Sequence, residues 1–259
     1  IRNNTSTFYG GGMHLRESNP TLTYVTISHN TAISGGGMSL EESNPILTYV
    51  LISYNIIPND GGGMFLSRSN PTLIHVTISH NTANEGQGMV LNSSAPIVTN
   101  SIVWHNIHCH NDWCHESIYL VGDENEPTIT YSNIEDGWEG VGNIDSDPLF
   151  INPENDNYTL LEDSPCIDIG TADLNGNGID DITNYSGSAP DMGAFEYNLF
   201  LGDVNGDQEI SILDIIIIVS IAIENHNPSD QEQTVSDINY DTIIDILDII
   251  LLINIILNN

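Results

Sequence analysis

Two acidic segments near the C-terminus have the residue types and the spacing of cation-binding loops. Each reads as a twelve-residue loop with oxygen-bearing side chains at positions 1, 3, 5, 9 and 12 and a backbone carbonyl at position 7. The donors of the first loop are Asp203, Asn205, Asp207, Glu209 (carbonyl), Ser211 and Asp214; those of the second are Asp237, Asn239, Asp241, Ile243 (carbonyl), Asp245 and Asp248. Calcium takes roughly six to eight oxygen ligands and suits such a loop better than magnesium does. The sequence therefore predicts two calcium sites, with helix-capping aspartates as the alternative.

A third segment matches the opening of the same pattern. Its alternate positions are Asp173, Asn175, Asn177, Ile179 (carbonyl) and Asp181. Gly178 stands at position 6, where the backbone of such loops has a positive φ. Position 12 is Asn184, which cannot supply a carboxylate with two oxygens. We treat this segment as a third calcium candidate, with a cluster of Asn-Gly turns as the alternative.

Apolar stretches overlap the ends of the two C-terminal loops and predict helices. Residues 212–223 and 243–257 are short for a membrane span and contain polar residues such as Asp214 and Asn254, so membrane insertion is not expected. Both helices are apolar on every side, and a domain of about sixty residues is too small to cover them. We expect a partner, or the rest of the chain, to bury part of this surface.

The duplicated loops, the aspartate at position 12 and the helix after each loop resemble a dockerin, the calcium-folded module that docks into a cohesin domain. The resemblance covers about residues 201–257. It implies that partners are recognised through loop positions 10 and 11, which are identical apolar pairs here: Ile212, Leu213, Ile246 and Leu247. One departure is that Gln208 and Thr242 occupy position 6 instead of glycine. We expect the resulting strain to weaken calcium affinity.

The part of the chain before these loops contains a repeat of about 25 residues. The segment GGGMHLRESNPTLTYVTISHNTA (residues 10–32) recurs three times, the last time more loosely, and Met13, Met38, Met64 and Met89 are 25, 26 and 25 residues apart. Short alternating apolar runs, separated by glycine triplets and Asn-Pro, indicate strands and turns. Three short strands per unit, stacked about 4.8 Å apart, predict a parallel β-helix with apolar ladders and an asparagine ladder inside.

The repeats resemble those of polymorphic outer-membrane proteins, whose GGA and FxxN elements correspond to GGGM and to ISHN (Ile27–Asn30). Two later segments, Pro127–Phe150 and Ser164–Tyr197, look like the closing region of secreted right-handed β-helix proteins. Together these resemblances cover about residues 1–197 and imply a fold but no activity.

We therefore expect a mainly β protein with a small helical domain at its end. A right-handed parallel β-helix with coils of about 25 residues is predicted over residues 1–122, and closing coils over 123–198. A dockerin-like domain of paired calcium-binding loop and helix units is predicted over residues 199–259.

The charge balance limits the possible partners. The chain has 36 acidic and 3 basic residues, no lysine and a formal net charge of −33. This charge repels nucleic acid and anionic membranes, which are excluded as partners. It also argues against a polysaccharide lyase, which usually needs a cationic base; Arg16 and Arg68 are predicted to lie two coils apart. A polysaccharide lyase, a glycoside hydrolase and a carbohydrate-binding module remain the alternatives to a structural role.

Two further groups of residues leave alternatives open. Cys109 and Cys114 lie in the segment HCHNDWCHE, which favours a disulfide over a metal site or unpaired thiols, and Cys166 is then a lone buried thiol. A second group takes equivalent turn positions and forms a surface ladder or a sugar-binding strip: His29, Tyr54, His80 and His105.

These observations predict a secreted or cell-surface protein with a structural or adhesive role. It would assemble through its calcium-dependent, dockerin-like module with a cohesin-type partner or with another copy of itself, which would allow filaments to form. A polysaccharide is a possible additional partner.

Overall fold

The computed structural model describes residues 1–106, 117–122, 124–197, 201–207, 209–239 and 241–258, with the backbone alone for residues 109–110, 113–114, 230, 231, 234 and 258. The chain divides into two compact units, Ile1–Glu196 and Tyr197–Asn259, and each is described by itself. Within the described ranges, no helix combines the length and the apolar character needed to cross a membrane.

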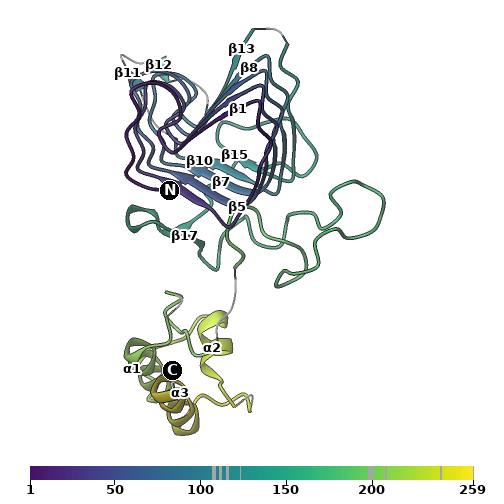
Figure 1. Ribbon diagram of the computed structural model, residues 1–259. Helices are drawn as coiled ribbons and strands as arrows, with labels where there is room; N and C mark the ends of the chain where they lie inside the picture. The colour runs from purple at the N-terminus through teal and green to yellow at the C-terminus, as the bar shows by residue number, and fades with distance from the viewer. Residues whose placement is uncertain are drawn as a thin grey trace. The chain divides into compact units, whose positions relative to one another are not determined.

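The first unit is a parallel β-helix (Figure 1). One sheet has five parallel strands: β1 (Met13–Arg16), β4 (Met38–Glu41), β6 (Met64–Ser67), β8 (Met89–Asn92) and β13 (Ile118–Val121). The other sheet contains β2 (Thr21–Thr23), β3 (Thr26–Ser28), β5 (Ile46–Ser53), β7 (Thr72–Ser79), β9 (Ile97–Thr99), β10 (Ile102–Trp104), β14 (Thr128–Thr130) and β15 (Asn133–Ile134). The predicted β-helical fold is confirmed.

The predicted second and third strands of a coil merge in the middle of the stack. In β5 and β7 they form one eight-residue strand, bent at a single residue with positive φ: Tyr49 (φ 54°) and His75 (φ 52°). The register continues on both sides of the bend, with Thr48 opposite Ile74 and Val50 opposite Val76. Each coil therefore contributes to two sheets. The second and third of the three expected strands belong to the same sheet and are separated by a bend.

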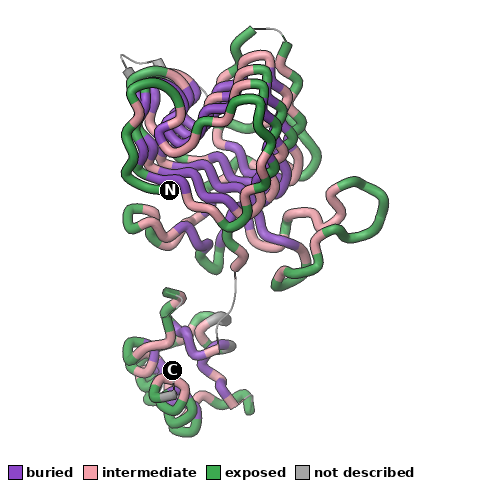
Figure 2. The backbone as a smooth tube through the Cα atoms, in the orientation of Figure 1, coloured by how far each residue is buried: buried purple, intermediate pink, exposed green. Residues whose placement is uncertain are grey.

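The interior of the β-helix consists of stacked apolar side chains. Figure 2 shows the backbone of the strands that carry them as buried, purple rows. Parallel pairing places Met38, Met64 and Met89 directly above one another, and all three are fully buried. The glycine triplets allow the coils to approach closely, because a Cβ at Gly37 would lie 2.5 Å from the carbonyl oxygen of Gly63. The apolar ladders are as the sequence predicted.

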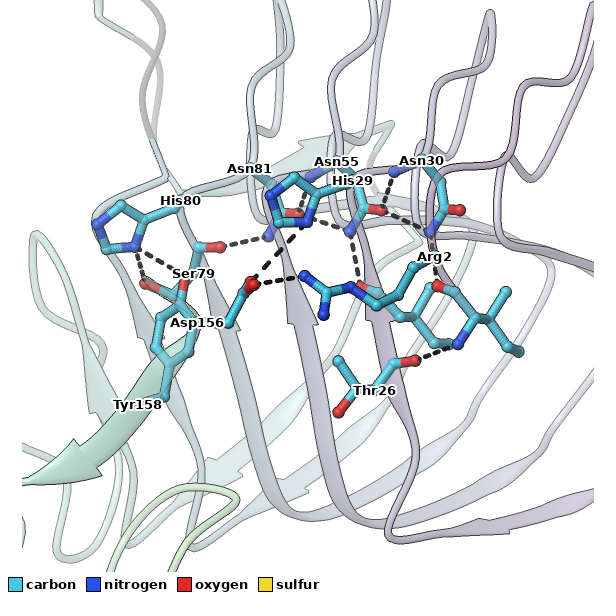
Figure 3. A network of polar contacts seen from close by, with 12 residues as sticks. Arg2, Thr26, His29, Asn30, Asn55, Ser79, His80, Asn81, Asp156 and Tyr158 are labelled. Carbon is cyan, nitrogen blue, oxygen red and sulfur yellow. Dashed lines mark hydrogen bonds and ion pairs between the residues drawn. The ribbon is translucent and has the colours of Figure 1, made fainter. Parts of the chain in front are cut away.

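The asparagines form the expected inward ladder (Figure 3). The amide nitrogen of Asn55 donates to the Ile27 carbonyl at 3.0 Å and to Oδ1 of Asn81 at 2.9 Å. Its own Oδ1 accepts from the backbone N–H and the side-chain amide of Asn30, each at 3.0 Å. The buried amide thus satisfies turn backbone and joins three consecutive coils, which is a structural role.

A second layer covers part of the outer face of the eight-stranded sheet. It consists of β16 (Phe150–Asn152), the 3₁₀ helix η1 (Pro153–Asn155), β17 (Asn157–Leu160) and the irregular chain that follows. Ala194 and Tyr158 pack on Leu51, and the Ala194 N–H donates to Oγ1 of Thr77 at 2.9 Å. Outward-pointing side chains of the central coils are therefore buried, which the repeat pattern alone did not predict.

The second unit is small and helical. It contains α1 (Ile212–Ala222), α2 (Asp230–Ser236) and α3 (Ile246–Asn258). Its core brings together residues from the helices and from the loops before them, including Val204, Ile218, Ile238 and Leu252.

Candidate metal and docking site

The first C-terminal loop is closed by the carboxylate at its twelfth position. Asp214 is fully buried. Its Oδ1 accepts from the backbone N–H groups of Val204 at 2.8 Å and Asn205 at 3.1 Å, and its Oδ2 accepts from the N–H of Ser211 at 2.8 Å. Ser211 also caps α1, since its hydroxyl accepts from the Leu213 N–H at 3.1 Å. Asp214 therefore fixes both the loop and the start of the helix.

The second loop repeats this geometry. Asp248 is fully buried, and its Oδ1 accepts from the N–H groups of Ile238 at 2.9 Å and Asn239 at 3.3 Å. Its Oδ2 accepts from the N–H of Asp245 at 2.9 Å, and the Asp245 carboxylate in turn accepts from the Leu247 N–H at 2.7 Å. The sequence duplication is thus a structural duplication. The position-9 residues, predicted as ligands, serve as helix caps here.

Side chains at odd loop positions accept hydrogen bonds from backbone N–H groups of the same loop. Asp207 Oδ1 accepts from the Glu209 N–H at 2.9 Å, and Asp241 Oδ1 accepts from the Ile243 N–H at 2.9 Å. The first-position Asp237 accepts from the N–H of Thr242 at 2.8 Å. Asp203, Asn205 and Asn239 make equivalent contacts with the N–H groups of their own loops.

The predicted strain at loop position 6 is present in the second loop. Thr242 has a φ of 69°, a left-handed conformation that costs a β-branched residue about 1–2 kcal/mol. Gln208, its counterpart in the first loop, lies outside the described residues.

The donor set of these loops fits calcium. Carboxylate, amide, hydroxyl and carbonyl oxygens alternate along each loop, and hard cations of this size prefer oxygen ligands. Within the described parts of the chain, no group of three or more Asp, Glu, His and Cys side chains is arranged to hold a metal ion by itself. The donors expected in each loop therefore include amide and backbone carbonyl oxygens as well as carboxylates.

Both apolar pairs at loop positions 10 and 11 face solvent. The exposed fractions are 68% for Ile212, 54% for Leu213, 60% for Ile246 and 51% for Leu247. We call these four residues the Ile–Leu pairs. Each pair forms the first two residues of a helix and stands directly before the aspartate that closes its loop, so the loop determines where the pair points.

Comparison with protein families assigns both units. Residues 11–159, more than half of the chain, match the right-handed β-helix region family. The chain belongs to the right-handed β-helix family. Residues 201–257 match the dockerin type I domain, in agreement with the predicted resemblance. No curated protein and no solved structure gives a significant match.

The dockerin domain implies assembly through cohesin partners, and type I dockerin domains bind calcium. The sequence had pointed to only four exposed docking residues. Ile216 and Ile250, one helical turn after the pairs, are also exposed, at 60% and 48%, as are Ile223 and Leu257. These residues have the same spacing in the two loop–helix units, which the sequence does show. Because both helices are apolar on every side, the sequence does not show which of their residues are exposed.

The third candidate loop lies in the β-helix unit and closes in a different way. Asp181, at position 9, accepts from the N–H of Leu174 at 3.0 Å, as Asp214 and Asp248 do from position 12 of their loops. The pKa of Asp173 is lowered because backbone N–H groups, first that of Gly178, donate to its carboxylate. Asn184 is therefore not needed to close the loop. Asn175 and Asn177 each accept from a backbone N–H two residues further on.

The structure describes the side chain of one of the three cysteines. Cys166 is a fully buried free thiol that accepts from the Asn133 side-chain amide at 3.1 Å, and burial raises its pKa to about 11. The backbones of β11 (Cys109–His110) and β12 (Trp113–Cys114) pair antiparallel with Cys109 opposite Cys114. Their side chains lie outside the described residues, so the disulfide stays a prediction.

Proposed function

We propose that this protein is a rigid extracellular or cell-surface β-helix unit that its dockerin domain fixes to a larger assembly. The observation that carries the proposal is the pair of identical, exposed Ile–Leu pairs, each placed by a buried aspartate, Asp214 or Asp248. A solvent-exposed isoleucine and leucine, side by side and duplicated, are costly in a free domain and useful in an apolar interface.

The proposal includes two calcium sites in the dockerin domain and a third at Asp173–Asp181. Bound calcium supplies positive charge among the loop oxygens. The chain's own residues do the rest: Asp214 and Asp248 hold the loop backbone, Ser211 and Asp245 start the helices, and the helices present the Ile–Leu pairs.

The β-helix unit supports a structural role better than a catalytic one. Each of its three arginines is paired with a carboxylate: Arg2 with Asp156, Arg16 with Glu41 at 3.5 Å and Arg68 with Glu42 at 2.8 Å. These cations are therefore already neutralised and poorly suited to bind a substrate carboxylate. The second layer also covers outward-facing side chains of the central strands, where Thr77 is 1% exposed.

The proposal names a cohesin as the partner, and self-association is the competing outcome. The test is surface plasmon resonance of the full chain on a panel of type I cohesin domains, with calcium and then with chelator. Replacing one pair (Ile212→Asp with Leu213→Asp) should leave binding largely intact, because the second pair is equivalent. Replacing both pairs should abolish it.

Sedimentation velocity on the same samples separates the outcomes. A calcium-dependent dimer or larger species that needs the Ile–Leu pairs would identify a second copy as the partner. Capture by no cohesin, together with a mass that calcium and chelator leave unchanged, would contradict the proposed assembly function. An Asp181→Asn variant should lower the number of bound calcium ions by one without changing the docking.

A further inference from the structure

A shallow groove crosses the outer face of the five-stranded sheet, away from the covered eight-stranded sheet. Its volume is about 220 Å³. It is lined mainly by Tyr9, His14, Ser39, Glu41, Phe65 and Ser67.

The parallel register builds this groove from three coils. His14, Ser39 and Phe65 are aligned on β1, β4 and β6, with Ser39 in the middle. Because neighbouring strands lie about 4.8 Å apart, the rings of His14 and Phe65 stand roughly 10 Å apart. The small side chain of Ser39, which is 3% exposed, forms the floor between the two rings, and the small side chain of Ser67 lies beside it in the next outward row.

The groove combines an aromatic wall with hydrogen-bonding groups. Tyr9 is 55% exposed and stacks on His14, with 5.8 Å between ring centroids and 24° between planes. Glu41 offers carboxylate oxygens, and the partly exposed Ser67 offers a hydroxyl that both donates and accepts. Binding sites for small molecules have this composition, in which aromatic faces supply contact and a few polar groups fix orientation.

Charge restricts the ligand. Arg16 lies 3.5 Å and Arg68 3.9 Å from the Glu41 carboxylate, and Glu42 contacts Arg68. The local arginines are thus neutralised, while the chain as a whole carries −33. An anionic ligand would be repelled by this field.

We propose that the groove binds one or two rings of a neutral saccharide. A pyranose ring has apolar C–H faces that pack on aromatic rings and hydroxyl edges that bond to carboxylates and serines. The groove is smaller than the roughly 300–1,000 Å³ of a pocket for a drug-sized ligand, which limits it to a short stretch of a chain. The site belongs to the β-helix unit and does not rest on the dockerin domain.

The test is isothermal titration calorimetry of the full chain with four probes: cellohexaose, xylohexaose, mannohexaose and hexagalacturonate. At least one neutral hexasaccharide should bind with a Kd on the order of 1 mM or tighter, as suits a shallow site. Tyr9→Ala and Phe65→Ala should each weaken this binding roughly five- to tenfold. Ser67→Trp, which fills the groove, should remove it.

A matched control is Tyr24→Ala, which removes a 73% exposed tyrosine at the bend of the other sheet and should leave saccharide binding unchanged. Tyr9 is itself exposed, so its variant is expected to fold, and an unchanged urea unfolding midpoint of the β-helix unit would confirm this separately from sugar binding. Three results would overturn the proposal: no binding of any neutral hexasaccharide, equal binding by Tyr9→Ala, or preference for hexagalacturonate.

Discussion

Replacing Asp214 by alanine should unfold the dockerin domain while leaving the β-helix intact. The carboxylate accepts three backbone N–H bonds, and hydrogen bonds to a charged group contribute about 1.5–3 kcal/mol each. Val204 is only 5% exposed, so its N–H would lose its partner without gaining water, whereas Asn205 is exposed and recovers part of the loss. We therefore expect a loss of about 3–5 kcal/mol.

That loss is comparable with the stability of the whole domain. A unit of this size, Tyr197–Asn259, has about 3–9 kcal/mol to lose at typical values per residue. All three α-helices of the described chain lie in it, so the helical circular-dichroism band reports on it selectively. Guanidinium unfolding with calcium present should show this band reduced at zero denaturant in Asp214→Ala.

The control is Asp181→Ala, which removes a carboxylate that accepts from the Leu174 N–H and the Asn175 amide in an exposed loop of the β-helix unit. It should leave the helical band unchanged. An Asp214→Ala protein whose helical band and unfolding midpoint match the wild type would refute the assignment of Asp214 as the residue that closes the loop.

Three further predictions concern the β-helix unit. Burial lowers the pKa of His75 from 6.5 to about 4, so between these pH values the unfolded chain binds a proton that the folded chain does not. The free energy of unfolding should therefore fall as pH drops from about 6.5 to about 4. Urea titrations at each pH should show a smaller fall in His75→Gln. Cys166 is fully buried and its pKa is raised, so peptide mapping after iodoacetamide treatment should find it unmodified until denaturant is added. Asn81→Ala breaks a central rung of the ladder and should cost about 3 kcal/mol in urea unfolding, against about 1 kcal/mol for Asn4→Ala at the exposed end; equal costs would argue against the ladder.

Most of the fold could be predicted because the repeat fixes the register. Met13 and its three successors are equally spaced, and parallel stacking is the arrangement that places such residues over one another. The two loops could be recognised because the segment is duplicated, and Asp214 and Asp248 close them at equal positions; calcium binding by the loop oxygens stays a prediction.

What the sequence did not reveal depends on contacts between distant segments. Nothing in the residues around Ala194 indicates that they pack on Leu51 and Thr77. The aromatic rings of the turn ladder were a candidate sugar-binding strip, but they stack on one another, with His29 and Tyr54 at 5.2 Å, and His80 also contacts Tyr158. The inner rings Tyr54 and His80 have ring neighbours on both sides, so their faces are occupied, whereas Tyr9 stacks on His14 and stays 55% exposed.

The groove at Tyr9 was missed for a related reason. Ser39 and Phe65 are 26 residues apart and look unremarkable in their repeats. Only the register shows that a small side chain stands between two rings.

The account depends most on metal binding by the two C-terminal loops, and a calcium titration of the full chain by isothermal titration calorimetry tests this directly. The wild type should bind calcium at two sites that are lost together in the Asp214→Ala, Asp248→Ala double variant, and at a third site that disappears in Asp181→Asn. A wild-type chain that takes up no calcium, or whose binding is unchanged in the double variant, would contradict the central claim.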